Sequence, residues 1–178
     1  MRRRGEISDE EYLEIEASYS RSDGHCNTMG TASTMTSMAE ALGTTLTGAA
    51  AIPAADSRRR ALAHVTGRRI VQMVRDDLRL SQILTPAAFH NAIATLHALG
   101  GSTNAVIHLP AIAGRLGLDL PLERFDELSR EVPFLANVKP SGEYLMEQFH
   151  AAGGVPAVMA EIADSLELGA LTDRKSVV

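Results

Sequence analysis

The chain has 178 residues, of which 45% are hydrophobic and 22% are charged, with a formal net charge of −5. This composition is typical of an ordinary globular chain, and the length fits one domain. The acidic balance and the 4% aromatic content argue against binding to nucleic acid or anionic lipid, because they supply neither charge attraction nor base stacking.

The sequence also limits localisation and redox chemistry. No apolar run approaches the roughly 20 residues that span a bilayer, and the basic residues 2–4 are followed by acidic residues, not by the apolar core of a signal peptide. We therefore expect a cytoplasmic protein with no membrane partner. Cys26 is the only cysteine, so no internal disulfide can form, and a metal bound there would need ligands from elsewhere.

The first predicted element is a helix from Asp9 to about Tyr19, because Ser8 and Glu11 form a capping box. A second helix is expected to begin near Asn27 or Thr28 and to end at Gly43. Its apolar residues recur at the spacing of one buried helix face, namely Met35, Met38, Ala39 and Leu42.

A third helix is predicted after the capping residue Asp56, with Gly67 as a possible break. Its expected apolar stripe consists of Leu62, Val65, Ile70, Met73 and Val74. The next helix has Thr85 as its cap, Pro86 at its first position and a double glycine as its end. Its buried face is expected to contain Phe89, Ile93 and Leu96.

The second half continues as helices, with one candidate strand. We predict a helix over 102–117 with Pro110 inside it, a short amphipathic helix over 122–132, and two last helices within 142–169. Residues 133–142 are the best strand candidate. One strand cannot form a sheet, so either further strands are missed here or the rest of the sheet lies outside this chain.

Cys26 lies just before the predicted start of the second helix. Unpaired amides and the helix dipole at such a position favour a thiolate, the form of cysteine that binds metals and attacks substrates. The neighbouring glycine, asparagine and threonines suit a tight loop around a bound group. A small buried hydrophobic cysteine is the alternative.

Four segments carry a family resemblance in the same order, namely "GHCNTMGTASTMTSMAEALG", "AAIPAADSRRRALAHVTGRRIVQMV", "ILTPAAFHNAIATLHALGGSTNAVIHLPAIAGRLG" and "NVKPSGEYLMEQFHAAGGVPAVMAEI". The chain from about Ile7 to Ala170 resembles the family of dihydroxy-acid, phosphogluconate and sugar-acid (aldonate) dehydratases. The wording "HCNTMGTASTM" is more similar to the sugar-acid branch than to the "SCSGMFTANSM" type of dihydroxy-acid dehydratases.

The resemblance implies a chemistry for Cys26. These enzymes convert a 2,3-dihydroxy acid to a 2-keto acid with an iron-sulfur cluster, 2Fe-2S or in some members 4Fe-4S, and with Mg²⁺. By its position Cys26 resembles the third cluster ligand. The family also implies an α/β fold, a homo-oligomeric state (dimer or tetramer) and a small hydroxy acid as the bound partner.

The other family motifs are missing from this chain, which implies an internal fragment. The first two cluster cysteines, the magnesium ligands and the catalytic serine belong to segments that this sequence does not contain. We expect 1–178 to form a single incomplete, mostly helical part of the N-terminal domain, with a tail at 171–178 that departs from the family pattern. We predict no catalytic residue here, no bound cofactor and no activity alone.

Other candidates and alternatives stay open. Asn104 and His108 are spaced like a two-ligand site, and Ser102 and Thr103 could hold an anion, although capping and buried hydrogen bonds are the simpler interpretation. His90 and His97 lie seven residues apart on one face, and a solvent-facing or partly buried pair is the simpler interpretation. The arginines at 58–60 could meet a phosphate or a carboxylate, and a helix flank that is solvated or paired with local acids is the simpler interpretation. The parent could be a dihydroxy-acid dehydratase of branched-chain amino acid biosynthesis. A stand-alone helical interaction module is the alternative from another class.

Overall fold

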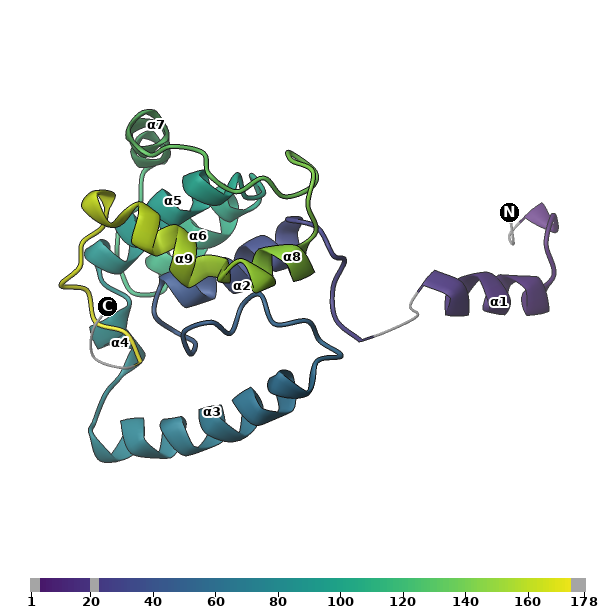
Figure 1. Cartoon of the computed structure of the whole chain (residues 1–178), viewed down its shortest axis with the longest axis horizontal. Coiled ribbons are helices and arrows are strands. Elements are labelled where there is room, and N and C mark those ends of the chain that lie inside the picture. The colour runs from purple at the N-terminus through teal and green to yellow at the C-terminus, as the bar shows by residue number, and fades with distance from the viewer. Residues whose placement is uncertain (1–3, 20–22, 174–178) are drawn as a thin grey trace.

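The computed structural model describes residues 4–19 and 23–173 as helices joined by loops (Figure 1). In chain order the helices are α1 Asp9–Tyr19, α2 Thr31–Ala41, α3 Ser57–Arg75, α4 Leu80–Ile83, α5 Pro86–Leu99, α6 Ala105–Gly114, α7 Leu122–Glu131, α8 Met146–Ala151, α9 Gly154–Glu161 and a short 3-10 helix at Ala163–Ser165. The predicted predominance of helix is confirmed for the described residues.

The predicted helix starts form as expected at α1 and α3. In the capping box of α1, Ser8 Oγ accepts from the Glu11 amide at 3.0 Å and a Glu11 carboxylate oxygen accepts from the Ser8 amide at 2.7 Å. Hydrogen bonding to the carboxylate from the Ser8 backbone, and secondly from its side chain, lowers the pKa of Glu11. Asp56 caps α3 by accepting from the Arg58 amide at 2.8 Å. Gly67 does not break α3, which is continuous.

Helix α5 is the centre of the folded body. It packs against α2, α6, α7 and α9, and its buried side chains include Phe89, Ile93 and Leu96, as predicted. Thr85 caps its start and Gly100 ends it in the left-handed conformation with φ of 58°. A helix that is apolar on nearly all sides is stable only inside a core, and this one is surrounded by the rest of the chain.

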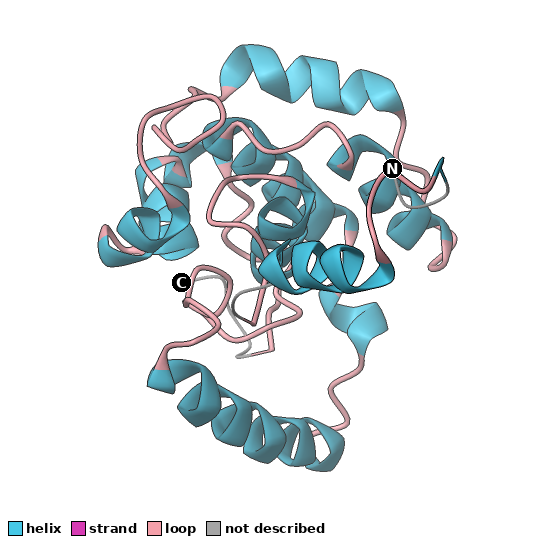
Figure 2. Cartoon of the chain, turned by 90° about the vertical axis from the view of Figure 1, so that its right-hand side faces the viewer, coloured by secondary structure: helices cyan, strands magenta, loops and turns pink. Residues whose placement is uncertain are grey.

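Helices α1 and α3 lie apart from this body (Figure 1). Figure 2 shows α3 below the body, joined to it by a loop at each end. The predicted burial of the α3 stripe is wrong, because Met73 is its one buried member. The physical reason is the lack of a packing partner among the described residues, since Ile70 and Val74 are 55% and 75% exposed.

The predicted strand over 133–142 is also wrong. The described residues contain no named strand, and Val138 and Tyr144 form only an isolated bridge. The amides of Leu135 and Ala136 instead donate to the carbonyl of Ala98 at 2.9 and 3.0 Å. The segment therefore satisfies its backbone groups on the end of α5, where no second strand is available for a sheet.

The end of the described chain packs against the turn after α2. The amide of Asp173 donates to the carbonyl of Gly43 at 2.9 Å. Residues 174–178 of the expected tail lie outside the described residues. Among the residues that are described, no helix combines the length and apolar character that crossing a bilayer requires.

Candidate functional site

The loop that carries Cys26 is longer than predicted, because α2 begins at Thr31 and not at Asn27 or Thr28. Long-range hydrogen bonds explain the difference. The amide of Met29 donates to the carbonyl of Lys139 at 2.7 Å, so it cannot enter the helical pattern. The sequence does not reveal this partner, which is more than a hundred residues away.

Asn27 ties the same loop to the start of α8. Its backbone carbonyl accepts from the Met146 amide at 3.2 Å, and its side-chain oxygen accepts from the Glu147 amide at 3.1 Å. Free amides at a helix start need such acceptors. Asn27 therefore caps α8 and not its own helix, and it fixes the residue next to Cys26.

Cys26 is an exposed thiol beside the start of α2. Its Sγ lies 3.4 Å from Thr28 Oγ1. A Cβ built on Gly30, the N-cap residue of α2, would lie 3.6 Å from the same sulfur. The alternative of a cysteine buried in the core is thus wrong, and the sulfur is accessible to a ligand from outside the chain.

His25 is held by a buried hydroxyl of α2. Its Nδ1 lies 3.1 Å from Ser33 Oγ and 2.9 Å from the carbonyl oxygen of Cys26. The Ser33 hydroxyl is fully buried and donates its one proton to the carbonyl of Thr28 at 2.6 Å. Both neighbours of Nδ1 can therefore only accept, so Nδ1 carries the proton and Nε2 of the neutral ring keeps a lone pair.

A cavity of about 560 Å³ opens beside Cys26. Residues 50–55, the loop that leads to α3, form its apolar wall. Its polar lining is Asp23, His25, Cys26, Asn27, Thr36, Arg59 and Glu147. A concave site with an apolar wall and a few convergent polar groups suits a small polar ligand.

Glu40 of α2 anchors the apolar wall from behind. Its carboxylate accepts from the amides of Gly48 and Ala50 at 2.5 and 2.8 Å. The side chain is in the core at 8% exposure. Burial raises the pKa of Glu40, and the two hydrogen bonds oppose that rise. The Glu40 carboxylate thus accepts from loop amides that, in a sheet, would pair with a neighbouring strand.

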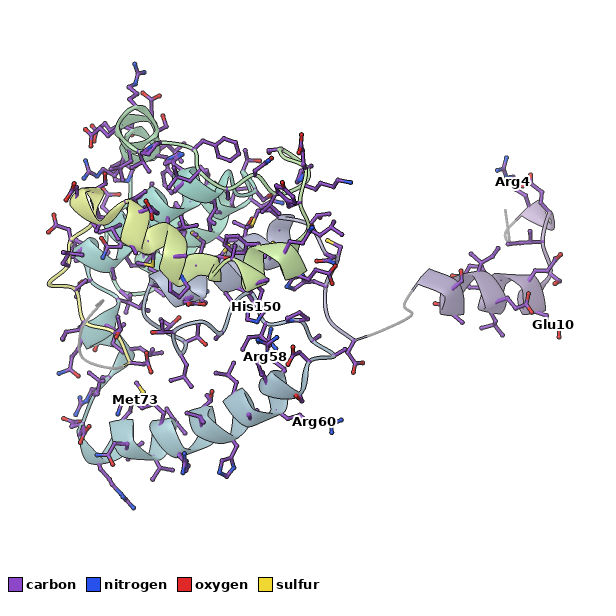
Figure 3. The ribbon with its side chains drawn as sticks, in the orientation of Figure 1. Arg4, Glu10, Arg58, Arg60, Met73 and His150 are labelled. Atoms are coloured by element: carbon purple, nitrogen blue, oxygen red, sulfur yellow. The ribbon has the colours of Figure 1, made fainter. Side chains whose placement is uncertain are left out.

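The three arginines at the start of α3 have different roles. Arg59 donates to the carbonyls of Ala49 and Ile52, which fixes the other side of the wall. Arg58 forms an ion pair with Asp56, and its hydrogen bonds hold the pKa of that carboxyl well below its usual range. Arg60 points away from the body (Figure 3). Arg59 is the one of the three that lines the cavity.

The candidates near the start of α6 are hydrogen-bonded within the chain. Asn104 Nδ2 donates to Thr31 Oγ1 at 2.6 Å, and the Ser102 amide donates to Thr34 Oγ1 at 2.9 Å. Asn104 and His108 are joined through the backbone, where the His108 amide donates to the Asn104 carbonyl at 3.1 Å, and both side chains are exposed. The predicted burial is therefore wrong for both residues, and the predicted structural hydrogen bond is confirmed for the Asn104 side chain.

The His90 and His97 pair is structural as well. The His90 ring lies 2.9 Å from the Ser165 carbonyl and 2.8 Å from an Arg124 guanidinium nitrogen. Burial lowers the pKa of His97, against a smaller opposite effect of its hydrogen bond with the Phe125 backbone. Within the described ranges no three His, Cys, Asp or Glu side chains gather as a metal site.

Sequence reasoning missed several residues of this site, among them Ser33, Glu40, Met146 and Glu147. Ser33 and Glu40 were hidden because a polar residue inside an amphipathic helix is normally solvent-facing. Met146 and Glu147 were hidden because their contact with Asn27 exists only in the folded chain. The unusual run of hydroxyl residues on α2 was the available signal for Ser33.

Comparison with known proteins shows that the chain is similar to part of several dehydratases. The sequence model of the family described as "Dihydroxy-acid/6-phosphogluconate dehydratase N-terminal" matches residues 1–176. The chain is 60% identical over 161 residues to an L-arabinonate dehydratase of Rhizobium leguminosarum bv. trifolii, which covers 90% of this chain and 28% of that protein. It is 49% identical over 158 residues to a D-xylonate dehydratase of Caulobacter vibrioides, covering 89% and 26%.

A third relative belongs to the other substrate branch. The chain is 47% identical over 164 residues to a dihydroxy-acid dehydratase of Thermodesulfovibrio yellowstonii, which covers 92% of this chain and 30% of that protein. The chain thus spans less than a third of each of these relatives. The family match runs over nearly the whole sequence and includes the Cys26 loop, and from it we conclude that the chain belongs to the dihydroxy-acid/6-phosphogluconate dehydratase N-terminal family.

Proposed function

We propose that this chain is part of a cytoplasmic, homo-oligomeric iron-sulfur hydro-lyase that converts a 2,3-dihydroxy acid to a 2-keto acid. An aldonic acid is the substrate we favour, and a branched-chain dihydroxy acid is the second choice. The 60% identity to an L-arabinonate dehydratase, against 47% to a dihydroxy-acid dehydratase, supports this order. In the parent protein the chain would be a helical part of an α/β N-terminal domain. That residues 171–178 form a tail that departs from the family pattern stays a prediction.

The observation that carries the proposal is the accessible Cys26 sulfur at the mouth of a polar cavity. A cluster needs several thiolates, and this chain has one cysteine. Cys26 therefore fits the role of one cluster ligand, with the others supplied from outside the chain. The magnesium ligands would likewise come from elsewhere, as the family resemblance implies.

The residues of this chain would position the ligand and line the substrate space. Asn27 and Met29 fix the Cys26 loop against 139–147 through backbone hydrogen bonds. His25 Nε2 would accept from a substrate hydroxyl, and the Arg59 guanidinium supplies a positive charge to the cavity lining. When bound, the cluster supplies a Lewis-acidic iron that stabilises the departing hydroxide. The isolated chain would be inactive, because the remaining ligands and the base lie outside it.

The test places this chain in the context of a full-length relative. We would replace the matched segment of the Rhizobium leguminosarum L-arabinonate dehydratase with this chain, purify the chimera without oxygen, and measure iron content and 2-keto acid formation. L-arabinonate, D-xylonate and a branched-chain dihydroxy acid are the substrates. Cys26→Ser should lose most of the iron and at least about 100-fold in turnover.

Thr28→Val is the matched control, because it removes the neighbour of the sulfur and keeps the thiol. It should retain the iron complement. A Cys26→Ser chimera with full iron and normal turnover would exclude Cys26 as a ligand. A chimera that prefers the branched-chain acid would reverse the order of substrates.

A further inference from the structure

Helix α3 carries an exposed row of small and aliphatic side chains, which we call the outer stripe. Its members follow the i, i+4, i+7, i+8, i+11 spacing of one helix face, and they are Ala63, Gly67, Ile70, Val71 and Val74. All are exposed, with Val71 at 51% and Val74 at 75%. A Cβ built on Gly67 would meet no atom within 4 Å, so the centre of the stripe is open.

Side chains outside the stripe attach the same helix to the body. Near its start Arg59 donates to the carbonyls of Ala49 and Ile52. Near its end Met73 is buried at 9% exposure and Arg69 donates to the carbonyl of Asp173. Figure 3 shows Met73 on the body side of α3 and Arg60 pointing away. The helix is thus attached at both ends by side chains outside the stripe, and the stripe residues remain exposed.

The chemistry of the stripe defines the surface that would cover it. Ala63 and Gly67 let another backbone approach closely, and the aliphatic residues provide area to bury. Exposed basic side chains flank the stripe along one side, and they are Arg60, His64, Arg68 and Arg75. An apolar element with an acidic rim matches both properties.

We propose that the outer stripe is an interface with the part of a full-length dehydratase that lies outside this chain, through an apolar element bearing acidic side chains. This inference rests on the proposed function. The relatives provide the length for such a partner, because the chain spans only 26–30% of them. Pairing of two stripes from two copies would bring the basic flanks together, and three aliphatic side chains fall short of the about 800 Å² per partner that a stable dimer buries.

The test compares one substitution in two settings. Val71→Asp places a charge on the stripe, and Ala61→Asp places the same charge on an exposed position of α3 outside it. In the isolated chain both variants should change the Tm by less than about 2 °C. In the chimera with the L-arabinonate dehydratase, Val71→Asp should lower the Tm by at least about 4 °C and Ala61→Asp should not. Equal effects of both variants in the chimera would overturn the proposal.

A second measurement covers the case in which the Val71→Asp chimera does not fold. Deuterium exchange of the unsubstituted proteins should be at least about 10-fold slower for residues 63–74 in the chimera than in the isolated chain. No slowing would overturn the interface. A dimer of the isolated chain that Val71→Asp dissociates, seen by sedimentation, would assign the stripe to a second copy and also overturn it.

The chimera separates this inference from the proposed function. An active chimera with an unprotected stripe would reject the interface and leave the function standing. A folded, inactive chimera with a protected stripe would reject the proposed function and leave the interface standing.

Discussion

Helices α5 and α3 begin with the same kind of signal and end in opposite environments. Each has a side-chain cap, Thr85 on α5 and Asp56 on α3, and each contains aliphatic residues at helical spacing. Helix α5 is buried on nearly all sides, whereas Met73 is the one buried residue of α3. Local signals therefore define where a helix forms, and neighbouring elements decide whether its apolar face is covered.

Composition accounts for part of the difference. Helix α5 contains no Asp, Glu, Lys or Arg, whereas α3 contains six arginines. Unpaired charges are costly to bury, so α3 could never occupy the centre of the body. Its exposed aliphatic residues remain suited to one partner surface, while Arg59 and Arg69 attach the helix to the body.

The largest expected effect comes from truncating the centre of the body. Phe89→Ala on α5, at 1% exposure, should lower the free energy of unfolding by about 3–5 kcal/mol. Val74→Ala on α3, at 75% exposure, should change it by no more than about 0.5 kcal/mol. Urea unfolding followed by circular dichroism measures both. Similar losses for the two variants would contradict the division into a buried body and an uncovered helix.

The next largest effect concerns the loop that joins α2 to α3, which Glu40 holds in place. Glu40→Ala should destabilise the chain by about 1–3 kcal/mol, because the buried amide of Ala50 and the half-buried amide of Gly48 lose their acceptor. The comparison is made by urea unfolding at neutral pH. An unchanged midpoint would show that water replaces the carboxylate at both amides.

The pH dependence of stability tests whether burial of Glu40 outweighs its two hydrogen bonds. Burial raises the pKa of Glu40 above its ordinary 4.5, so its favourable contribution is fully present below about pH 4.5 and is lost as the pH rises through the folded-state pKa. The stability of the wild type relative to Glu40→Gln should therefore fall over this range and then level off. A rise instead would mean that the two hydrogen bonds outweigh burial.

The smallest effect comes from the two caps. Thr85→Ala should cost about 1 kcal/mol of global stability, because α5 unfolds with the body. Asp56→Ala should instead fray the first turn of α3, seen as faster deuterium exchange at residues 57–60, with no change in the global midpoint. Since Arg58 holds the pKa of Asp56 below its ordinary 3.8, this cap should persist above that pH and weaken only as the pH falls further.

A lower global midpoint for Asp56→Ala would show that α3 and the body unfold as one unit. That result would contradict the distinction between α3 and the body around α5.

Sequence patterns predicted the helices well where capping chemistry was local, as at Ser8, Asp56 and Thr85. They failed where a distant segment competed for the backbone, as at Met29, whose amide binds the Lys139 carbonyl. The strand over 133–142 failed for the same reason. For the site, Cys26 was found because of its type and its place before a helix, and the family resemblance around it is confirmed by the match over 1–176.

The sequence by itself determined the helical content, the family and the position of the one thiol, because caps, apolar spacing and the order of motifs are local properties of the chain. The tertiary structure alone decided which apolar faces are covered, which groups surround Nδ1 of His25, and how Glu40 and Arg59 hold the cavity wall. These features depend on hydrogen bonds and packing between segments far apart in the chain, and such contacts exist only once the backbone has folded.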